Sequence, residues 1–228
     1  MDLDSHYLNL HRTALQRIYK EGFESDSNLD NPHDNRRGLT LLLRPSREVK
    51  KNIREFLSAV ENDHPGHYLY PDTDLHVTVM PIISCYEGFE ISSGVWQKYF
   101  SVIEKAIKGV KRVELFFQGV MFSPSCIMIK GFPLNEQLEI FRDNLRGHFG
   151  DTDLEQSLDK RYKLVTAHST VVRFKKPIVH MDKMLELMDK YKDRVFGRTV
   201  FDHVDFVFND WYQREEHVRI LKRFEFED

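Results

Sequence analysis

Cysteine is scarce in this 228-residue chain: there are two, Cys85 and Cys126, and they form no Cys-x-x-Cys spacing. This scarcity argues against a disulfide framework and against a structural zinc site. No glycine-rich phosphate loop is present either. No stretch approaches the roughly 18 consecutive apolar residues of a membrane helix, and the first residues lack the basic start and apolar run of a signal peptide. We therefore expect no membrane association and a reducing, cytoplasmic setting.

An excess of positive charge is also missing. Thirty-three Lys and Arg residues against 36 Asp and Glu residues give a formal net charge of −3. That balance argues against a protein that coats long nucleic acids through a broad basic face. A nucleotide, a cyclic nucleotide or a short RNA stays compatible, because such a ligand needs only a local basic patch. The length fits one large domain or one domain built of two lobes, and the oligomeric state is left open.

The most informative feature that is present is a short pattern that occurs twice, His76-Val77-Thr78-Val79 and His168-Ser169-Thr170-Val171. Each copy lies in an apolar, β-branched run typical of a strand. Alternate side chains of a strand share a face, so each histidine is expected on the same side as the threonine that follows it. If the two strands lie near each other, two imidazoles and two hydroxyls face one space.

Such a set suits a phosphate group. The ordinary histidine pKa of roughly 6.5 keeps both protonation forms available near neutrality, so one imidazole can accept a proton while the other donates one, in either order. The hydroxyls can donate hydrogen bonds to the non-bridging phosphate oxygens. This chemistry requires no metal and no cofactor. The alternative for each copy alone is a buried histidine bonded to a backbone carbonyl, but the matching context of the two copies favours a shared site.

Helices and strands alternate along the chain. Residues 1–37 are expected to form a helical extension and a polar linker, and residues 38–228 a two-lobed domain. Strands outnumber helices and often come as adjacent pairs, which favours antiparallel or mixed sheets. Each half of the domain is expected to hold one His-x-Thr strand, then a helix, then two paired strands. The expected helices cover about 5–22, 46–61, 93–108, 134–149 and 180–191, and the expected strands about 39–43, 67–70, 75–83, 113–122, 126–130, 163–174, 198–208 and 217–226.

Together with Leu75 and Arg173 beside them, the two motifs resemble the two-histidine phosphoesterase superfamily, which includes 2′-5′ RNA ligase-like proteins and cyclic phosphodiesterases. The resemblance covers roughly residues 38–226. It implies an α+β, bilobal fold in which two pseudo-symmetric lobes, with antiparallel or mixed sheets, flank a central groove. One departure from the commonest family pattern is valine in place of leucine at the fourth motif position, in both copies.

The resemblance also implies an activity. Family members act without a metal on 2′,3′-cyclic phosphates, on 2′-5′ linkages or on RNA ends. By carry-over, His76 and His168 are the expected acid and base, and Thr78 and Thr170 the expected phosphate binders. The alternative is a catalytically silent domain that holds RNA or a nucleotide in the same groove.

Three further residues have open interpretations. Tyr70, which alternates with Tyr68 along the strand before the first motif, is a candidate substrate-binding residue through base stacking, with core packing as the alternative. Arg173 is expected on the face opposite His168, so contact with a phosphate requires a twist or a bulge. Trp211, together with Tyr212 in the turn expected after Asn209-Asp210, forms either a wall of the substrate site or ordinary packing.

Overall fold

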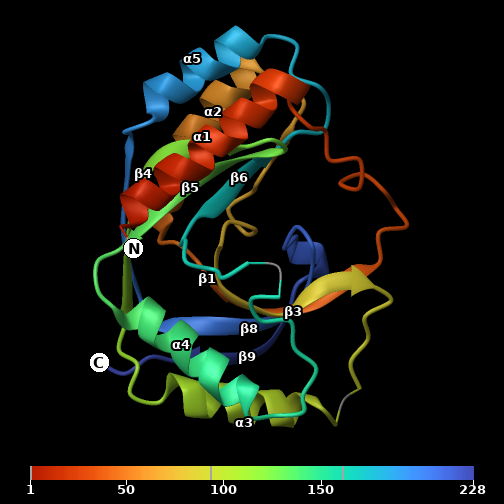
Figure 1. The fold of residues 1–228 in the computed structure, drawn as a ribbon, viewed down its shortest axis with the longest axis vertical. Helices are drawn as coiled ribbons and strands as arrows, with labels where there is room; N and C mark the ends of the chain where they lie inside the picture. The colour runs from red at the N-terminus through yellow and green to blue at the C-terminus, as the bar shows by residue number, and fades with distance from the viewer. Residues whose placement is uncertain (1, 93, 161) are drawn as a thin grey trace.

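Two antiparallel sheets face each other in the computed structural model, which describes residues 2–92, 94–160 and 162–228 (Figure 1). The four-stranded sheet has the order β3 (Val77–Glu87), β1 (Arg36–Leu43), β8 (His203–Asp210) and β9 (Arg219–Glu225). The five-stranded sheet has the order β2 (Tyr68–Leu69), β6 (Ser169–Arg173), β5 (Cys126–Pro133), β4 (Val113–Ser123) and β7 (Val195–Phe201).

Helices cover the outer face of each sheet. The helices α1 (Leu3–Glu21), α2 (Arg47–Asp63) and α5 (Met181–Tyr191) pack on the five-stranded sheet. The helices α3 (Trp96–Ile107) and α4 (Gln137–Gly150) pack on the four-stranded sheet, and a short 3-10 helix, η1 (Glu215–His217), precedes β9. The expected α+β fold with two lobes is confirmed, and the sheets are antiparallel. None of the helices in the described ranges has the length and apolar character needed to cross a membrane.

Local sequence signals explain where the helices begin and which face they bury. The Ser46 hydroxyl accepts a hydrogen bond from the Val49 amide and caps α2. The apolar side chains of α2 recur at helical spacing and are all buried: Val49, Ile53, Phe56, Leu57 and Val60. In α1 the Asp2 carboxylate caps the first turn, and Gly22, with φ of 81°, ends the helix. Both helices match the sequence-based expectation to within a few residues.

The strand expected over residues 163–174 is wrong in its first half, because β6 covers only Ser169–Arg173. Side chains from helices form hydrogen bonds with the backbone groups just before β6. The Thr166 carbonyl accepts a hydrogen bond from Arg142, and the Ala167 amide donates one to the Tyr7 hydroxyl. These groups are therefore not available to a neighbouring strand. His168, like His76 in the other lobe, lies one residue before its strand.

The strand expected over residues 198–208 is also wrong, since it is two strands in different sheets. β7 ends at Phe201 and pairs with β4, whereas β8 begins at His203 and pairs with β1 and β9. The expected pairs of neighbouring strands do form, β4 with β5 and β8 with β9. Each pair, however, lies in the sheet of the other motif strand, since β4 and β5 join β6 and not β3, and β8 and β9 join the sheet of β3. An apolar run identifies a strand but does not specify its partner. The two lobes are consequently interleaved along the chain.

Candidate active site

Both motif strands contain a β-bulge at the same position. The register of β3 against β1 skips Val79, and the register of β6 against β5 skips Val171. A bulge reverses the alternation of side chains beyond it. The third residue after each threonine, Pro81 in β3 and Arg173 in β6, therefore turns toward the same side as the threonine. The two strands are alike in geometry and differ in that one supplies a cation.

One cleft brings the two motifs together. His76 and Thr78, from the four-stranded sheet, and His168 and Thr170, from the five-stranded sheet, line a cleft of about 220 Å³. Arg173 lines the same cleft, as do several polar side chains that the sequence analysis did not single out: Thr40, Ser84, Ser157, Asn209 and Gln213. The four motif residues proposed from the sequence thus face one space, with a guanidinium beside them.

His76 is held by the backbone two residues before it. Its Nδ1 lies 2.7 Å from the Asp74 carbonyl oxygen. A carbonyl oxygen can only accept a hydrogen bond, so Nδ1 carries the proton and Nε2 of the neutral ring has a free lone pair. The neutral ring is therefore preset as a proton acceptor at Nε2.

His168 is held at the equivalent place by a different group. Its Nδ1 lies 2.9 Å from the Thr166 hydroxyl oxygen. A hydroxyl can donate or accept, so this contact suits a neutral ring with its proton on Nε2 as well as a doubly protonated ring. The two histidines occupy matching positions, but only His168 has a partner that can change its hydrogen-bonding role.

Burial controls the charge of both rings. It lowers the pKa of His76 to about 3 and that of His168 to about 4, and the positive charges of nearby arginines act in the same direction. Both imidazoles are therefore neutral at pH 7 when the cleft is empty. A bound phosphate anion adds a negative charge beside the rings and favours their protonation.

This protonation pattern predicts how stability depends on pH. The unfolded chain binds protons at both histidines with a pKa of roughly 6.5, whereas the folded cleft does not until far lower pH, so stability falls as pH drops below about 6.5. Between pH 7 and pH 5 we expect the wild type to lose about 1–2 kcal/mol of unfolding free energy for each of the two histidines. The double variant His76→Asn with His168→Asn should lack this part of the loss. Urea unfolding at the two pH values measures the difference. His33→Asn, at an exposed position, is the control and should follow the wild type; an equal loss in all three proteins would contradict the prediction.

Arg173 reaches the cleft because of the bulge at Val171, which is the condition set by the sequence analysis. Its Nε donates to the Tyr70 hydroxyl at 3.2 Å, its guanidinium pairs with Asp26 at 3.5 Å, and it lies 5.3 Å from the centre of the Tyr212 ring. These contacts hold the cation in place. The guanidinium keeps further N–H groups that can contact an anion in the cleft.

Tyr70 itself is 2% exposed and is not among the described residues that line the cleft. Its ring centre lies 6.4 Å from that of His76, and its hydroxyl holds Arg173. The structure therefore places it behind the site. Trp211, in contrast, is half-buried and lines the cleft.

Arg142 of α4 ties the two motifs to each other. It is 3% exposed, and it donates to the carbonyl oxygens of Val79 at 2.9 Å, Thr78 at 3.0 Å and Thr166 at 2.8 Å. Burial lowers its pKa to about 10, which leaves it charged at pH 7. This residue was not predicted from the sequence. A signal was present, because Arg142 falls within the apolar stripe of α4, which buries Leu138, Phe141, Leu145 and Phe149.

Tyr7 supports the second motif from α1. Its hydroxyl donates to the Gly131 carbonyl at 3.0 Å and accepts from the Ala167 amide, next to His168, at 3.1 Å. Tyr7→Phe removes these contacts and a longer one from the Gly131 amide at 3.4 Å, and it should lower the unfolding free energy by about 1–3 kcal/mol. Tyr19→Phe, on the same helix with 67% of the residue exposed, is the matched control and should have no effect. Thermal or urea unfolding measures both variants, and equal stability of the two would contradict this role for Tyr7.

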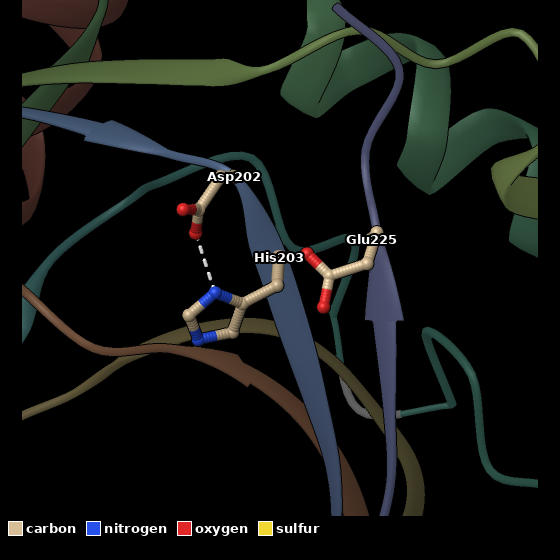
Figure 2. A group of neighbouring side chains, drawn as sticks. All are labelled: Asp202, His203 and Glu225. Carbon is tan, nitrogen blue, oxygen red and sulfur yellow. Dashed lines mark hydrogen bonds and ion pairs between the residues drawn. The ribbon is translucent and has the colours of Figure 1, made fainter.

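A group of side chains with metal-binding spacing lies elsewhere, at the start of β8 and the end of β9 (Figure 2). The donor atoms of Asp202, His203 and Glu225 lie within 4.8 Å of one another. Both carboxylates are exposed, and His203 already bonds Asp202. None of the three lines the cleft that holds the two motifs.

Comparison with known proteins places the fold. The Thermus thermophilus protein TT0787 matches with a TM-score of 0.58 and 16% identity, over 82% of this chain and 97% of its own. A protein described as a phosphoesterase matches with a TM-score of 0.56 and 11% identity, over 85% of this chain and 99% of its own. Escherichia coli LigT, solved in complex with 3′-AMP, matches with a TM-score of 0.53 and 12% identity, over 85% of this chain and 99% of its own. No protein-family model matches the sequence, and no curated protein sequence does either. The likeness establishes a shared fold and agrees with the architecture expected from the paired motifs.

Proposed function

We propose that this chain, which has the fold of the two-histidine phosphoesterases, is a metal-independent phosphodiesterase that acts on a nucleotide or an RNA-derived phosphodiester. The observation that carries the proposal is the convergence of both histidines, both threonines and Arg173 on one cleft. The neighbours add support, since one is described as a phosphoesterase and LigT was solved with 3′-AMP, ATP and NADP+.

The phosphate is bound by three groups in this proposal. The hydroxyls of Thr78 and Thr170 donate hydrogen bonds to its two non-bridging oxygens, one from each lobe. Arg173 supplies the positive charge that stabilises these oxygens as phosphorus gains a fifth ligand. Tyr70 and Asp26 hold the guanidinium in advance of binding, so little reorganisation is needed in the transition state.

The hydrogen bonds of the two rings favour an assignment of roles. His76, whose Nε2 is preset as an acceptor, is the general base, and His168, whose partner tolerates the doubly protonated ring, is the general acid. For a 2′,3′-cyclic phosphate, His76 takes a proton from water as the water oxygen attacks phosphorus. The bond from phosphorus to one ribose oxygen breaks, and His168 protonates that oxygen. For a 2′-5′ diester, a neighbouring hydroxyl replaces the water as the nucleophile.

His168 takes up the proton it needs from solvent when the substrate binds. The pKa of the ring is about 4 in the empty cleft, and a phosphate anion beside it raises this pKa. Protonation is therefore coupled to binding. We expect a bell-shaped dependence of kcat on pH, in which activity falls toward acid as His76 gains a proton and falls toward base as His168 loses one.

A substrate panel tests the proposal. Purified protein is incubated with 2′,3′-cyclic nucleotides, 2′-5′ dinucleotides and short RNA in the presence of a metal chelator, and products are resolved by chromatography. We expect turnover of at least one substrate class, with turnover by the double variant His76→Ala with His168→Ala lowered at least about 10²-fold. Nucleotide binding without turnover in the wild type would instead support the silent binding domain. Abolition of wild-type turnover by the chelator would contradict the metal-independent mechanism.

A further inference from the structure

A second cavity, of about 430 Å³, lies between the first turns of α1 and the helix α4. Leu3 and His6 line it from α1, and Leu138 and Arg142 line it from α4. Lys163 and Leu164, from the segment that leads into the second motif, complete the wall. Its volume falls in the range of small-molecule sites. Leu164 and Arg142 connect it to the catalytic cleft, since Leu164 lines both spaces and Arg142 bonds the backbone of both motifs.

The hydrogen bonds of Arg142 are incomplete on the side of this cavity. A guanidinium has five N–H donors. The Nε–H and the two Nη2–H groups bond the carbonyls of Val79, Thr78 and Thr166. The two Nη1–H groups have no hydrogen-bond partner among the residues that the structure describes. Nη1 is not among the fully buried unpartnered atoms of the described residues, so these donors are open to solvent. An arginine that is only 3% exposed, with two donors open to a cavity and a full positive charge, suits an acceptor of negative charge there.

The other charges around the cavity reinforce this preference. Lys163 is exposed and has no ion-pair partner within the described ranges. Arg146 is already neutralised by Asp143 and Asp159. The N-cap residue Glu136 makes no side-chain cap, and the Asn135 side-chain oxygen accepts a hydrogen bond from the first amide of α4, that of Gln137, at 3.3 Å. The positive end of the helix dipole lies at this wall.

Two carboxylates oppose the cations. Glu136 and Glu139 also line the cavity, but both are exposed, so solvent and salt screen their charge more than they screen that of Arg142. The rest of the lining is largely apolar: Leu3, Pro133, Leu134, Leu138, Leu164 and Val165. The cavity therefore combines a buried cation with apolar walls.

We propose that this cavity binds a small oxyanion, a phosphate or a carboxylate, carried on an apolar body. The anion contacts Nη1 of Arg142 and the Lys163 ammonium, and the body packs against the leucines. Because the same guanidinium holds Thr78, Val79 and Thr166, occupancy of the cavity changes how firmly the two motifs are held together. The binding site is independent of the proposed activity, whereas the coupling to catalysis rests on it.

The binding test uses phenyl phosphate and benzoate, which present the two anions on the same apolar ring. Titration of the isotope-labelled full chain is followed by NMR at the Arg142 Nε–Hε group and the amides of Leu164 and Val165. We expect saturable shifts at these positions with at least one probe, and the preferred probe distinguishes phosphate from carboxylate. Shifts limited to residues of the catalytic cleft, or no shifts, would overturn the site.

Two variants make the result specific. Lys163→Glu reverses an exposed charge and should weaken binding at least about tenfold, which corresponds to about 1.4 kcal/mol; Leu138→Trp fills the cavity and should abolish binding. Lys51→Glu, an equally exposed change on α2 in the other lobe, should leave affinity unchanged. Equal weakening by the two lysine variants would show a general charge effect and overturn the site.

The coupling has its own readout. Benzoate lacks the phosphodiester of the substrates, so its effect on turnover of a cyclic nucleotide reports the second site. We expect at least a twofold change in kcat or KM in the wild type and none in Lys163→Glu at the same benzoate concentration. Binding without this change would overturn the coupling and leave the site. Absence of turnover in every protein would count against the proposed function only, since the NMR titration does not depend on activity.

Discussion

Replacement of either His76 or His168 by alanine is expected to lower kcat/KM by about 10²–10⁴-fold, because each removes one proton transfer from the transition state. The double variant should be scarcely worse than the single variants, since the two rings act as a unit. Steady-state kinetics on the substrate that the wild type turns over fastest measures the losses. His33→Ala changes an exposed histidine and is the control. A loss below about fivefold in either single variant would contradict the proposed roles.

The assignment of base and acid has a sharper test. A nucleotide p-nitrophenyl phosphodiester has a leaving group that departs without protonation. On this substrate, His168→Ala should recover most of its lost activity, whereas His76→Ala should remain impaired, because the nucleophile still needs a base. Recovery by His76→Ala in place of His168→Ala would reverse the assignment. Equal recovery by both would contradict the hydrogen-bond argument from Asp74 and Thr166.

Arg142→Met is expected to have the largest effect on stability. The substitution keeps an apolar stem in the stripe of α4 but leaves three carbonyl groups, from Thr78, Val79 and Thr166, without their donor. Buried groups left unsatisfied cost about 1–3 kcal/mol each, so we expect a loss of about 3 kcal/mol or more in unfolding free energy. Urea unfolding at pH 7 measures it. Activity at temperatures where the variant is folded should also fall, since the link between the motifs is gone.

Two comparisons separate this role from a general effect of charge. Arg142→Lys keeps a cation, but an ammonium cannot reproduce the planar fork that reaches three carbonyls, so an intermediate loss is expected. Arg112→Met removes an exposed arginine with 51% side-chain exposure and should stay within about 0.5 kcal/mol of the wild type. If Arg142→Met proved as stable as Arg112→Met, the three carbonyl contacts would not hold the motifs together.

The candidate site was predictable from the sequence in its chemistry. His76, Thr78, His168 and Thr170 stand in two copies of one pattern, each copy leads into an apolar strand, and a strand places alternate residues on one face. Arg173 was recognised as a neighbour of the second motif but not as part of the cleft wall. Its placement depends on the bulge at Val171, and a bulge comes from pairing with β5, which no local pattern records.

The supporting residues illustrate a different limit. Tyr7 acts through hydrogen bonds with Gly131 and Ala167, far along the chain, and Thr166 acts through one with His168 of the motif. Nothing in the local sequence of either residue marks these partners. Of these supporting residues, only Arg142 was recognisable in the sequence, as a charged residue within the apolar face of a helix. A charged residue at such a position is expensive to bury unless the fold provides acceptors, so it points to a structural role.

Residue identity and the periodicities of two and 3.6 residues along the chain are local properties, and they were enough to identify the two motifs, the type of most elements and the faces that these elements bury. The fold as a whole was needed to specify which strands share a sheet, where β7 ends and β8 begins, which way Arg173 points and which group bonds Nδ1 of each histidine. Those outcomes depend on hydrogen bonds and packing between segments distant in sequence, whose energies appear only when the segments meet.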